Sequence, residues 1–158
     1  MEIKEYTKFR TDEILPLYTQ VGWTAYTEDK AALEHGFQNS LLILAAYEKD
    51  ALLGLIRVVG DGATVIFVQD ILVYPEKQRQ GIGTALLKAV LDRYAHVRQI
   101  QLVTDNTPAA RSEIRDVSHP EGAAEHWLSD NTPRRRCHPA IAVYRLRMAT
   151  AGHRAVRL

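Results

Sequence analysis

The chain has a single cysteine, Cys137, among its 158 residues, and it has no long hydrophobic run. One thiol cannot form a disulfide within the chain, and alone it gives no metal-ligand spacing. No segment approaches the roughly 20 apolar residues that cross a bilayer, and Met1-Glu2-Ile3-Lys4 does not open a signal peptide. These absences predict a cytoplasmic protein without a membrane anchor, a structural disulfide or a bound metal.

The C-terminal third also lacks whole residue types. Residues 109–158 contain no lysine and no phenylalanine, although they hold nine arginines and four of the six histidines. Residues 1–108 have a net charge of −3 from 11 basic and 14 acidic side chains, and 109–158 have +4 from 9 basic and 5 acidic ones. The length still fits one domain over 1–158. We expect a body at 1–108 and an atypical C-terminal segment at 109–158.

Three explanations fit this change in composition: a divergent C-terminus, a separate basic segment, or a reading-frame change or artificial fusion that replaces the original ending. We favour the frame change or the fusion, because lysine usage and strand patterning vanish together. The run Arg134-Arg135-Arg136 can neutralise a few phosphates. No aromatic residues alternate with it as in a single-strand binding platform, so nucleic-acid binding through this tail is an alternative that we do not favour.

The most informative segment that is present spans residues 65–94. The apolar run 65–73 predicts a buried strand, and apolar residues at helical spacing from Ile82 predict an amphipathic helix that ends near Tyr94. Gly81 and Gly83 lie between them and allow close approach of a ligand. Unpaired N–H groups at such a helix start form a site for an anion, such as a cofactor phosphate. Alternatively, the glycines serve only a tight turn.

The other elements of the body follow from periodicity and turn residues. We expect strands at 1–6, 41–47, 51–59 and 99–104, a first helix from Thr11 or Asp12, and a second helix at 30–37. The predicted order is strand, two helices, three strands, helix, strand. Neither the third glycine of a Rossmann loop nor the Gly-Lys-Ser/Thr of a P-loop is present, which leaves a shorter pyrophosphate loop.

The arrangement Val73, Pro75-Glu76, Gln78-x-x-Gly81-x-Gly83 resembles motif A of the GNAT acetyltransferase superfamily. A strand at 99–104 follows in the place where that family has one, and the resemblance covers residues 1–108. It implies an α+β fold in which helices flank both faces of a mixed, mostly antiparallel sheet. It also implies an enzyme that moves acetyl from acetyl-CoA to a primary amine of a small molecule or peptide, without a metal.

The resemblance further implies where acetyl-CoA binds. Main-chain N–H groups of the glycine loop would hold the pyrophosphate, and the exposed edge of the strand at 71–73 would pair with the pantetheine arm, as another strand does. Asn106 would reach the same arm. The cofactor-binding residues predicted in this way are Ile71, Leu72, Val73, Gln78, Arg79, Gln80, Gly81, Ile82, Gly83, Thr84 and Asn106.

Attack of a neutral amine on the thioester needs a donor for the developing oxyanion and an acceptor for the amine proton. We predict the main-chain N–H at Leu72 as the donor, with Val73 beside it. Asp70 is the predicted proton acceptor because it interrupts an apolar strand, and Asp61 is the second candidate. Asp70 can equally face the wetter side of its strand.

The acceptor pocket is also predicted from the resemblance. In the family's fold the first two helices and the neighbouring strands border this pocket, which indicates Trp23, Tyr26 and Arg57 as substrate-binding residues. Trp23 and Tyr26 are spaced for one helical face, so the alternative is that they belong to the core.

The chain departs from the family after Asn106. The family continues with a helix that carries a tyrosine, the usual general acid for the departing thiolate, and Glu113 stands in its place here. An alternative function is therefore a CoA-binding GNAT-fold protein with weak or no catalysis. Many members pair as homodimers through their late strands, and 140–144 is the segment here that can supply one such strand. A homodimer is therefore a further expectation, which the altered ending puts in question.

Overall fold

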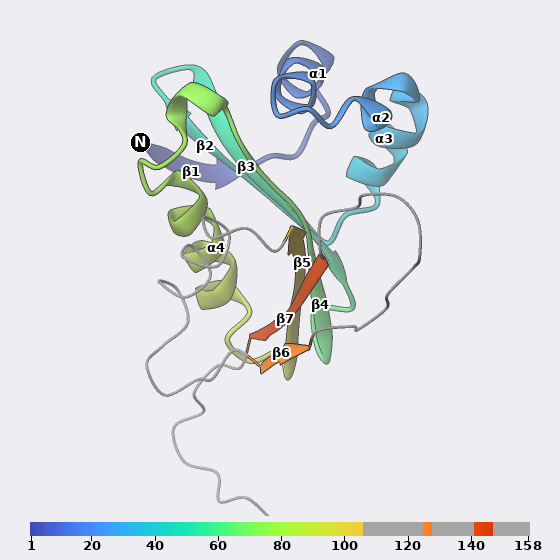
Figure 1. Cartoon of the computed structure of the whole chain (residues 1–158), viewed down its shortest axis with the longest axis vertical. Helices are drawn as coiled ribbons and strands as arrows, with labels where there is room; N and C mark the ends of the chain where they lie inside the picture. The colour runs from blue at the N-terminus through green and yellow to red at the C-terminus, as the bar shows by residue number, and fades with distance from the viewer. Residues whose placement is uncertain (106–124, 128–140, 147–158) are drawn as a thin grey trace, which may run out of the picture.

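The computed structural model describes residues 1–105, 125–127 and 141–146, and the side chains of 1–102 (Figure 1). Its described strands form one sheet in the order β1-β2-β3-β4-β5-β7-β6. They are β1 (Glu2–Glu5), β2 (Leu42–Glu48), β3 (Ala51–Gly60), β4 (Val65–Val73), β5 (Gln99–Asp105), β6 (Glu125–Trp127) and β7 (Ile141–Leu146). The helices are α1 (Thr11–Gln20), α2 (Thr24–Glu28), α3 (Lys30–Gln38), the short η1 (Pro75–Lys77) and α4 (Ile82–Arg93).

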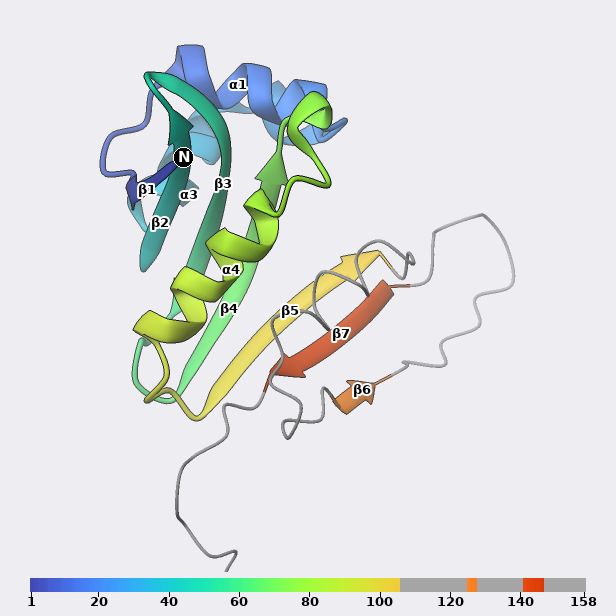
Figure 2. The same cartoon turned by 90° about the vertical axis from the view of Figure 1, so that its left-hand side faces the viewer.

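Helices pack on both faces of this sheet. The paired strands run antiparallel, apart from β4 and β5, which are parallel and are connected through α4. Helices α1 and α3 pack on one face and α4 on the other (Figures 1 and 2). The expected mixed, mostly antiparallel sheet with helices on both faces is confirmed.

Strand β2 shows why its sequence is apolar at nearly every position. Leu42 and Leu44 pack in the core beneath α4, whereas Ile43 and Ala45 pack in the core beneath α1 and α3. Successive side chains of a strand point to opposite faces. A central strand that is covered on both faces is therefore continuously apolar instead of alternating.

Most predicted elements are observed at nearly their predicted bounds. The strand predicted at 65–73 is β4, and the helix predicted from Ile82 is α4. Helix α3 begins at Lys30 as expected, because the Asp29 carboxylate accepts a hydrogen bond (2.9 Å) from the Ala32 N–H and caps the helix. The strand expected at 140–144 is β7, at 141–146. The sequence analysis did not predict α2 or β6.

A bulge in β4 changes the direction of its side chains. Asp70 lies opposite Arg57 of β3, whereas Val68 lies opposite Val58, so Gln69 is an extra residue with no counterpart. One extra residue moves the following side chains to the other face of the sheet. Val68 therefore packs beneath α4, and Asp70 lies on the opposite face, where it meets Tyr18 of α1.

The hairpin between β3 and β4 is held by Asp61. Its Oδ1 accepts hydrogen bonds from the N–H groups of Ala63 (2.9 Å), Thr64 (2.8 Å) and Val65 (3.0 Å). The Thr64 hydroxyl, followed by these N–H groups, holds the pKa of Asp61 well below its usual range. Because Asp61 lies at the beginning of β4 and the predicted site lies at its end, the prediction of Asp61 as a second proton acceptor is wrong.

We expect Asp61→Asn to lower stability at pH 7, and this deficit to shrink as the pH falls below about 4. The folded pKa of Asp61 lies below its unfolded value of about 3.9, so its stabilising contribution is complete above that value and is lost as the pH falls toward the folded pKa. Urea unfolding at pH 7 and pH 3 measures both. Asp50→Asn, in the exposed turn after β2, is the control. A deficit that is equal at both pH values would contradict the assignment.

Within the described residues, none of the helices is both long and apolar enough to cross a bilayer. In the same residues, no three His, Cys, Asp or Glu side chains converge as metal ligands would.

Candidate active site

The loop before α4 leaves main-chain N–H groups free at the start of the helix. Gly81 is the N-cap of α4, and its φ of 77° lies in the left-handed region that glycine adopts without strain. The first helical hydrogen bond runs from the Ala85 N–H to the Gly81 carbonyl (2.9 Å). In the described part of the chain, the N–H groups of residues 82–84 meet no acceptor. Together with the helix dipole they form a site for an anion.

Two glutamine side chains hold this loop, one against the end of β4 and the other against η1. Gln78 Nε2 donates to the Val73 carbonyl (3.1 Å), and Gln80 Nε2 donates to the Glu76 carbonyl (3.2 Å). Both were predicted to bind the cofactor. Because both side-chain amides are already hydrogen-bonded, Gln78 and Gln80 are predicted to contact the cofactor through their main chain.

The end of β4 presents an unpaired edge toward β5. β4 pairs with β5 only through Val65–Val68 in the part of the sheet that is described. The Tyr74 N–H donates to the Leu53 carbonyl of β3 (3.0 Å). Hydrogen-bonded and non-hydrogen-bonded pairs alternate along an antiparallel ladder, so Leu72 also bonds to β3, and the main-chain groups of Ile71 and Val73 face the open side. Of these, the Val73 carbonyl is the one that accepts from Gln78.

This alternation corrects one predicted role. Leu72 lies in a hydrogen-bonded pair with Leu55, so its N–H faces β3 and not a ligand at the open edge. The prediction of Leu72 as oxyanion donor is therefore wrong, because a sequence does not show which residues of a strand face which neighbour. Ile71 N–H faces the open edge beside Asp70, and it is the donor that the geometry favours.

A buried network of three polar side chains lies next to this edge. The Asp70 carboxylate forms an ion pair with Arg57 and accepts a hydrogen bond from the Tyr18 hydroxyl (2.7 Å), both through Oδ2. The side chain of Asp70 is 0% exposed, and that of Arg57 is 9% exposed. Asp70 Oδ1 is buried and has no hydrogen-bond partner among the described residues.

The network keeps the Tyr18 hydroxyl protonated. Burial, followed by the charge of Asp70, raises the pKa of Tyr18 well above its usual range. Burial opposes the charge of Arg57, but the hydrogen bond and the charge of Asp70 outweigh it and raise the pKa of Arg57. Tyr18 therefore serves as a hydrogen-bond donor and is a poor substitute for the missing tyrosine acid.

Asp70 lies in an environment that the sequence did not predict. The carboxylate is not on a wet face of the strand, so that alternative is wrong, and it is held by Arg57 instead of standing alone. The main-chain N–H of the next residue, Ile71, faces the open edge of β4. Oδ1 is the atom of Asp70 that is left to accept a proton, and this role stays a prediction.

Trp23 and Tyr26 form an exposed, stacked pair beside this network. Their ring centroids are 5.6 Å apart at an interplanar angle of 24°, and the residues are 37% and 40% exposed. The Tyr18 ring lies 6.2 Å from the Trp23 ring and 5.8 Å from the Tyr26 ring. The alternative that the pair belongs to the core is therefore wrong. The pair contacts the Tyr18 ring, and the Tyr18 hydroxyl bonds to Asp70, which pairs with Arg57.

The sequence analysis did not predict that Tyr18 belongs to the site, although its position in α1 indicates a buried hydroxyl that needs a partner. Tyr18 lies on the apolar face of α1 with Ile14 and Leu17, and all three are fully buried. A tyrosine at such a position needs a hydrogen-bond partner for its hydroxyl. The sequence does not show that the partner lies 52 residues away, at Asp70.

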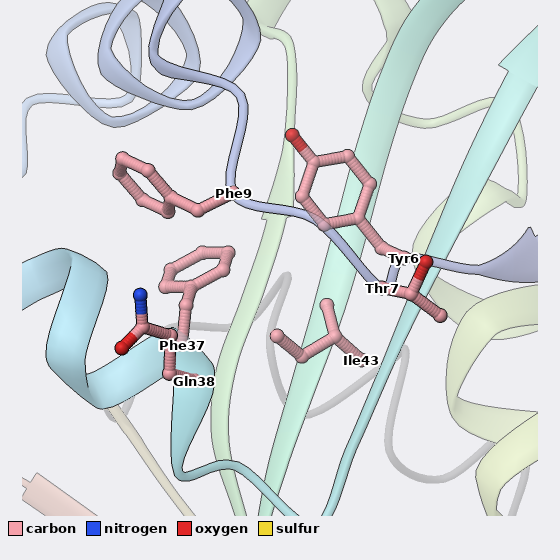
Figure 3. A pocket seen from close by; sticks show the side chains of 6 residues that line it. All are labelled: Tyr6, Thr7, Phe9, Phe37, Gln38 and Ile43. Carbon is pink, nitrogen blue, oxygen red and sulfur yellow. The ribbon is translucent and has the colours of Figure 1, made fainter.

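A small pocket lies beside Phe37 (Figure 3). It is lined by Tyr6, Thr7, Phe9, Phe37, Gln38 and Ile43. Phe37 packs edge-on against Phe9 at 5.1 Å, and Arg57 lies 5.5 Å from the Phe37 ring. Burial raises the pKa of Tyr6, which also lines the pocket, to about 12. The pocket therefore offers no group that exchanges protons near neutral pH.

Three features from the sequence analysis lie outside the described residues. They are Asn106, predicted to contact the pantetheine arm, Glu113, which stands where the family has its tyrosine, and the run Arg134-Arg135-Arg136. What the sequence analysis says of them stays a prediction.

Comparisons with known proteins identify the family of this chain. Residues 8–112 match the Acetyltransferase (GNAT) family. The chain belongs to the GNAT acetyltransferase family. A GNAT family acetyltransferase from Streptococcus pneumoniae TIGR4 is 34% identical, with a TM-score of 0.66 over 82% of this chain and 98% of that one.

More distant GNAT structures share the fold. The ribosomal-protein-S18-alanine N-acetyltransferase of Escherichia coli has a TM-score of 0.69 at 15% identity, over 99% of this chain and 100% of that one. A GNAT family acetyltransferase from Elizabethkingia anophelis, with acetyl-CoA bound, has a TM-score of 0.61 at 14% identity, over 92% and 97%. No curated protein matches the chain. As a GNAT member, the protein is an acyl-CoA N-acyltransferase. Membership of the family does not specify the acceptor amine.

Proposed function

We propose that this protein transfers acetyl from acetyl-CoA to a primary amine of a small molecule or peptide. The observation that carries the proposal is the continuity of two main-chain features. The open edge of β4 at Ile71–Val73 leads through η1 to the free N–H groups at the start of α4. One ligand with an extended arm and a pyrophosphate can use both at once.

Acetyl-CoA fits the groups that these elements offer. The N–H groups of residues 82–84 bind its pyrophosphate, and further donors are the Thr84 hydroxyl in the first turn of α4 and the Arg79 guanidinium in the loop before it. The extended pantetheine arm adds to the edge of β4 as a strand does. Asn106 is proposed to contact the same arm.

The chemistry follows from the residues beside that edge. When bound, acetyl-CoA supplies an activated acetyl thioester. The Ile71 N–H donates a hydrogen bond to the acetyl oxygen as negative charge develops there. Asp70 accepts the proton of the amine, and Trp23, Tyr26 and Arg57 surround the acceptor.

One observation favours a second candidate function, a CoA-binding protein with weak or no catalysis. Glu113 stands where the family has its tyrosine acid, and the raised pKa of Tyr18 makes that side chain a poor acid. Loss of a general acid slows the departure of the thiolate by a factor of about 10² to 10⁴. It leaves the main-chain site for acetyl-CoA in place.

We expect Ile71→Pro to lower kcat by about 100-fold or more and to leave binding of acetyl-CoA largely intact. Proline removes an N–H that faces the open edge. The ladder to β3 is unaffected, because Ile71 and Ile56 form a non-hydrogen-bonded pair. Release of CoA in the presence of a panel of primary amines measures kcat, and calorimetric titration of acetyl-CoA measures binding.

Leu72→Pro is the matched control, because it removes an N–H that faces β3 and lowers stability instead. Turnover of the parent protein with any amine of the panel supports acetyl transfer. Binding without turnover across the panel supports the second candidate, and a folded parent that does not bind acetyl-CoA contradicts both. An Ile71→Pro variant that keeps the parental kcat removes Ile71 from the mechanism.

A further inference from the structure

We propose that the acceptor is a monoamine attached to a planar apolar group, an arylalkylamine, whose ring stacks on Trp23 and Tyr26 and whose amino group donates to Asp70 Oδ1. This inference rests on the proposed function, because it names the substrate class of the same site. Three observations support it: an exposed aromatic pair, a buried oxygen without a donor, and a charge balance around Asp70.

The aromatic pair is an unusual surface feature. In the described part of the chain the exposed large hydrophobic side chains are Met1, Trp23, Tyr26 and Leu41, and two of these four lie stacked on each other. Stacked aromatic residues that are more than a third exposed present apolar area to solvent. A planar apolar ligand gains more from such a surface than a flexible polar one, because aromatic rings prefer offset-stacked or edge-to-face partners.

Asp70 provides the polar end of the same site. Its Oδ2 is used by Arg57 and Tyr18, whereas Oδ1 is buried and has no donor among the described residues. Buried carboxylate oxygens are almost always hydrogen-bonded. A primary amine has the N–H donors that Oδ1 lacks.

Tyr18 joins the two ends of the proposed site. Its hydroxyl binds Asp70, and its ring contacts both Trp23 and Tyr26. Oδ1 is closed to solvent in this structure, so the side chains around it must shift for an amine to reach it. None of the residues of α2, which carries Tyr26, is buried, and a shift of Tyr26 uncovers the Tyr18 ring, against which the ring of the ligand can pack.

The charge balance favours a monoamine over a polycation. Arg57 neutralises Asp70 within the network, so the site offers one hydrogen-bond acceptor and little net negative charge. A polyamine or an aminoglycoside needs several carboxylates to replace the water around its charges. One free oxygen next to an aromatic surface matches one amino group next to one ring.

The first test compares two acceptors that differ in planarity. For 2-phenylethylamine we expect a kcat/KM about tenfold higher than for 2-cyclohexylethylamine, which has the same chain length and a nonplanar ring. Kanamycin, a polycation, and a peptide with an N-terminal alanine complete the panel. Equal values for the two ring amines, or a higher value for either of the other acceptors, would overturn the proposal.

Variants then show which residues cause the preference for the planar amine. Trp23→Ala is expected to remove the tenfold preference, Trp23→Phe to retain most of it, and Leu41→Ala, an equally exposed apolar position outside the pair, to leave it unchanged. Asp70→Asn is expected to weaken binding of 2-phenylethylamine about tenfold and to leave binding of acetyl-CoA unchanged. A preference that survives Trp23→Ala contradicts the stacking. Unchanged amine binding in Asp70→Asn contradicts the proposed hydrogen bond from the amine to Oδ1.

Direct binding separates this inference from the proposed function. Calorimetric titration of 2-phenylethylamine into the protein, with and without CoA, needs no turnover. Amine binding that Trp23→Ala removes supports the aromatic site even if no acetyl transfer is detected. Acetyl transfer without preference for the planar ring supports the proposed function and overturns this inference.

Discussion

Gly81→Asp is expected to weaken binding of acetyl-CoA by about 100-fold or more. An aspartate at the N-cap of α4 places a negative charge next to the three free N–H groups, where the pyrophosphate is proposed to bind. Like charges about 4 Å apart near a protein surface repel by several kcal/mol, and about 2.7 kcal/mol corresponds to a factor of 100. Calorimetric titration of acetyl-CoA into parent and variant measures the effect.

Gly81→Asn is the matched control for this variant. Asparagine has nearly the size of aspartate and tolerates the left-handed conformation about as well, and no atom lies within 4 Å of a Cβ built on Gly81. Gly81→Asn therefore adds a side chain of the same size without the negative charge, and we expect it to weaken binding of acetyl-CoA much less than Gly81→Asp does. If Gly81→Asp binds acetyl-CoA as tightly as the parent, the pyrophosphate does not bind at this loop.

Arg57→Met is expected to lower the free energy of unfolding by about 3 to 5 kcal/mol. The substitution removes the positive partner of a carboxylate whose side chain is 0% exposed. Tyr18 remains as a donor to Asp70, but one neutral hydrogen bond does not replace a charge in a buried site. Urea unfolding followed by circular dichroism gives the difference between parent and variant.

Arg93→Met is the matched control, because it removes an ion pair on the surface. Arg93 pairs with Glu5, and both side chains are 49% exposed. Exposed pairs contribute about 0 to 1 kcal/mol, so this variant stays close to the parent. Equal effects of the two substitutions would show that Asp70 does not depend on Arg57 for its burial.

The glycine loop and the elements around it could be predicted because their signals are local. A continuous apolar run gives β4, and the spacing of apolar residues gives α4. A left-handed residue at the N-cap favours glycine at position 81 whatever the remainder of the chain does. Helix α2 lacks such signals, since it has five residues and buries none of them.

The environment of Asp70 could not be predicted in the same way. The sequence shows a carboxylate within an apolar strand, but the bulge at Gln69 decides which face it occupies. Its partners Arg57 and Tyr18 lie 13 and 52 residues away. Strand pairing likewise decides that Ile71, and not Leu72, faces the open edge, because adjacent residues direct their N–H groups to opposite neighbours.

The sequence by itself determined the order of the main elements, the anion site at Gly81 and the GNAT resemblance, since each depends on residues close together in the chain. Tertiary structure decided which N–H groups at the end of β4 are free, where Asp70 lies, and that Trp23 and Tyr26 stack in the open. The physical reason is that hydrogen-bond partners, ion pairs and burial belong to pairs of distant residues. Such pairs meet only when the sheet and its helices have assembled.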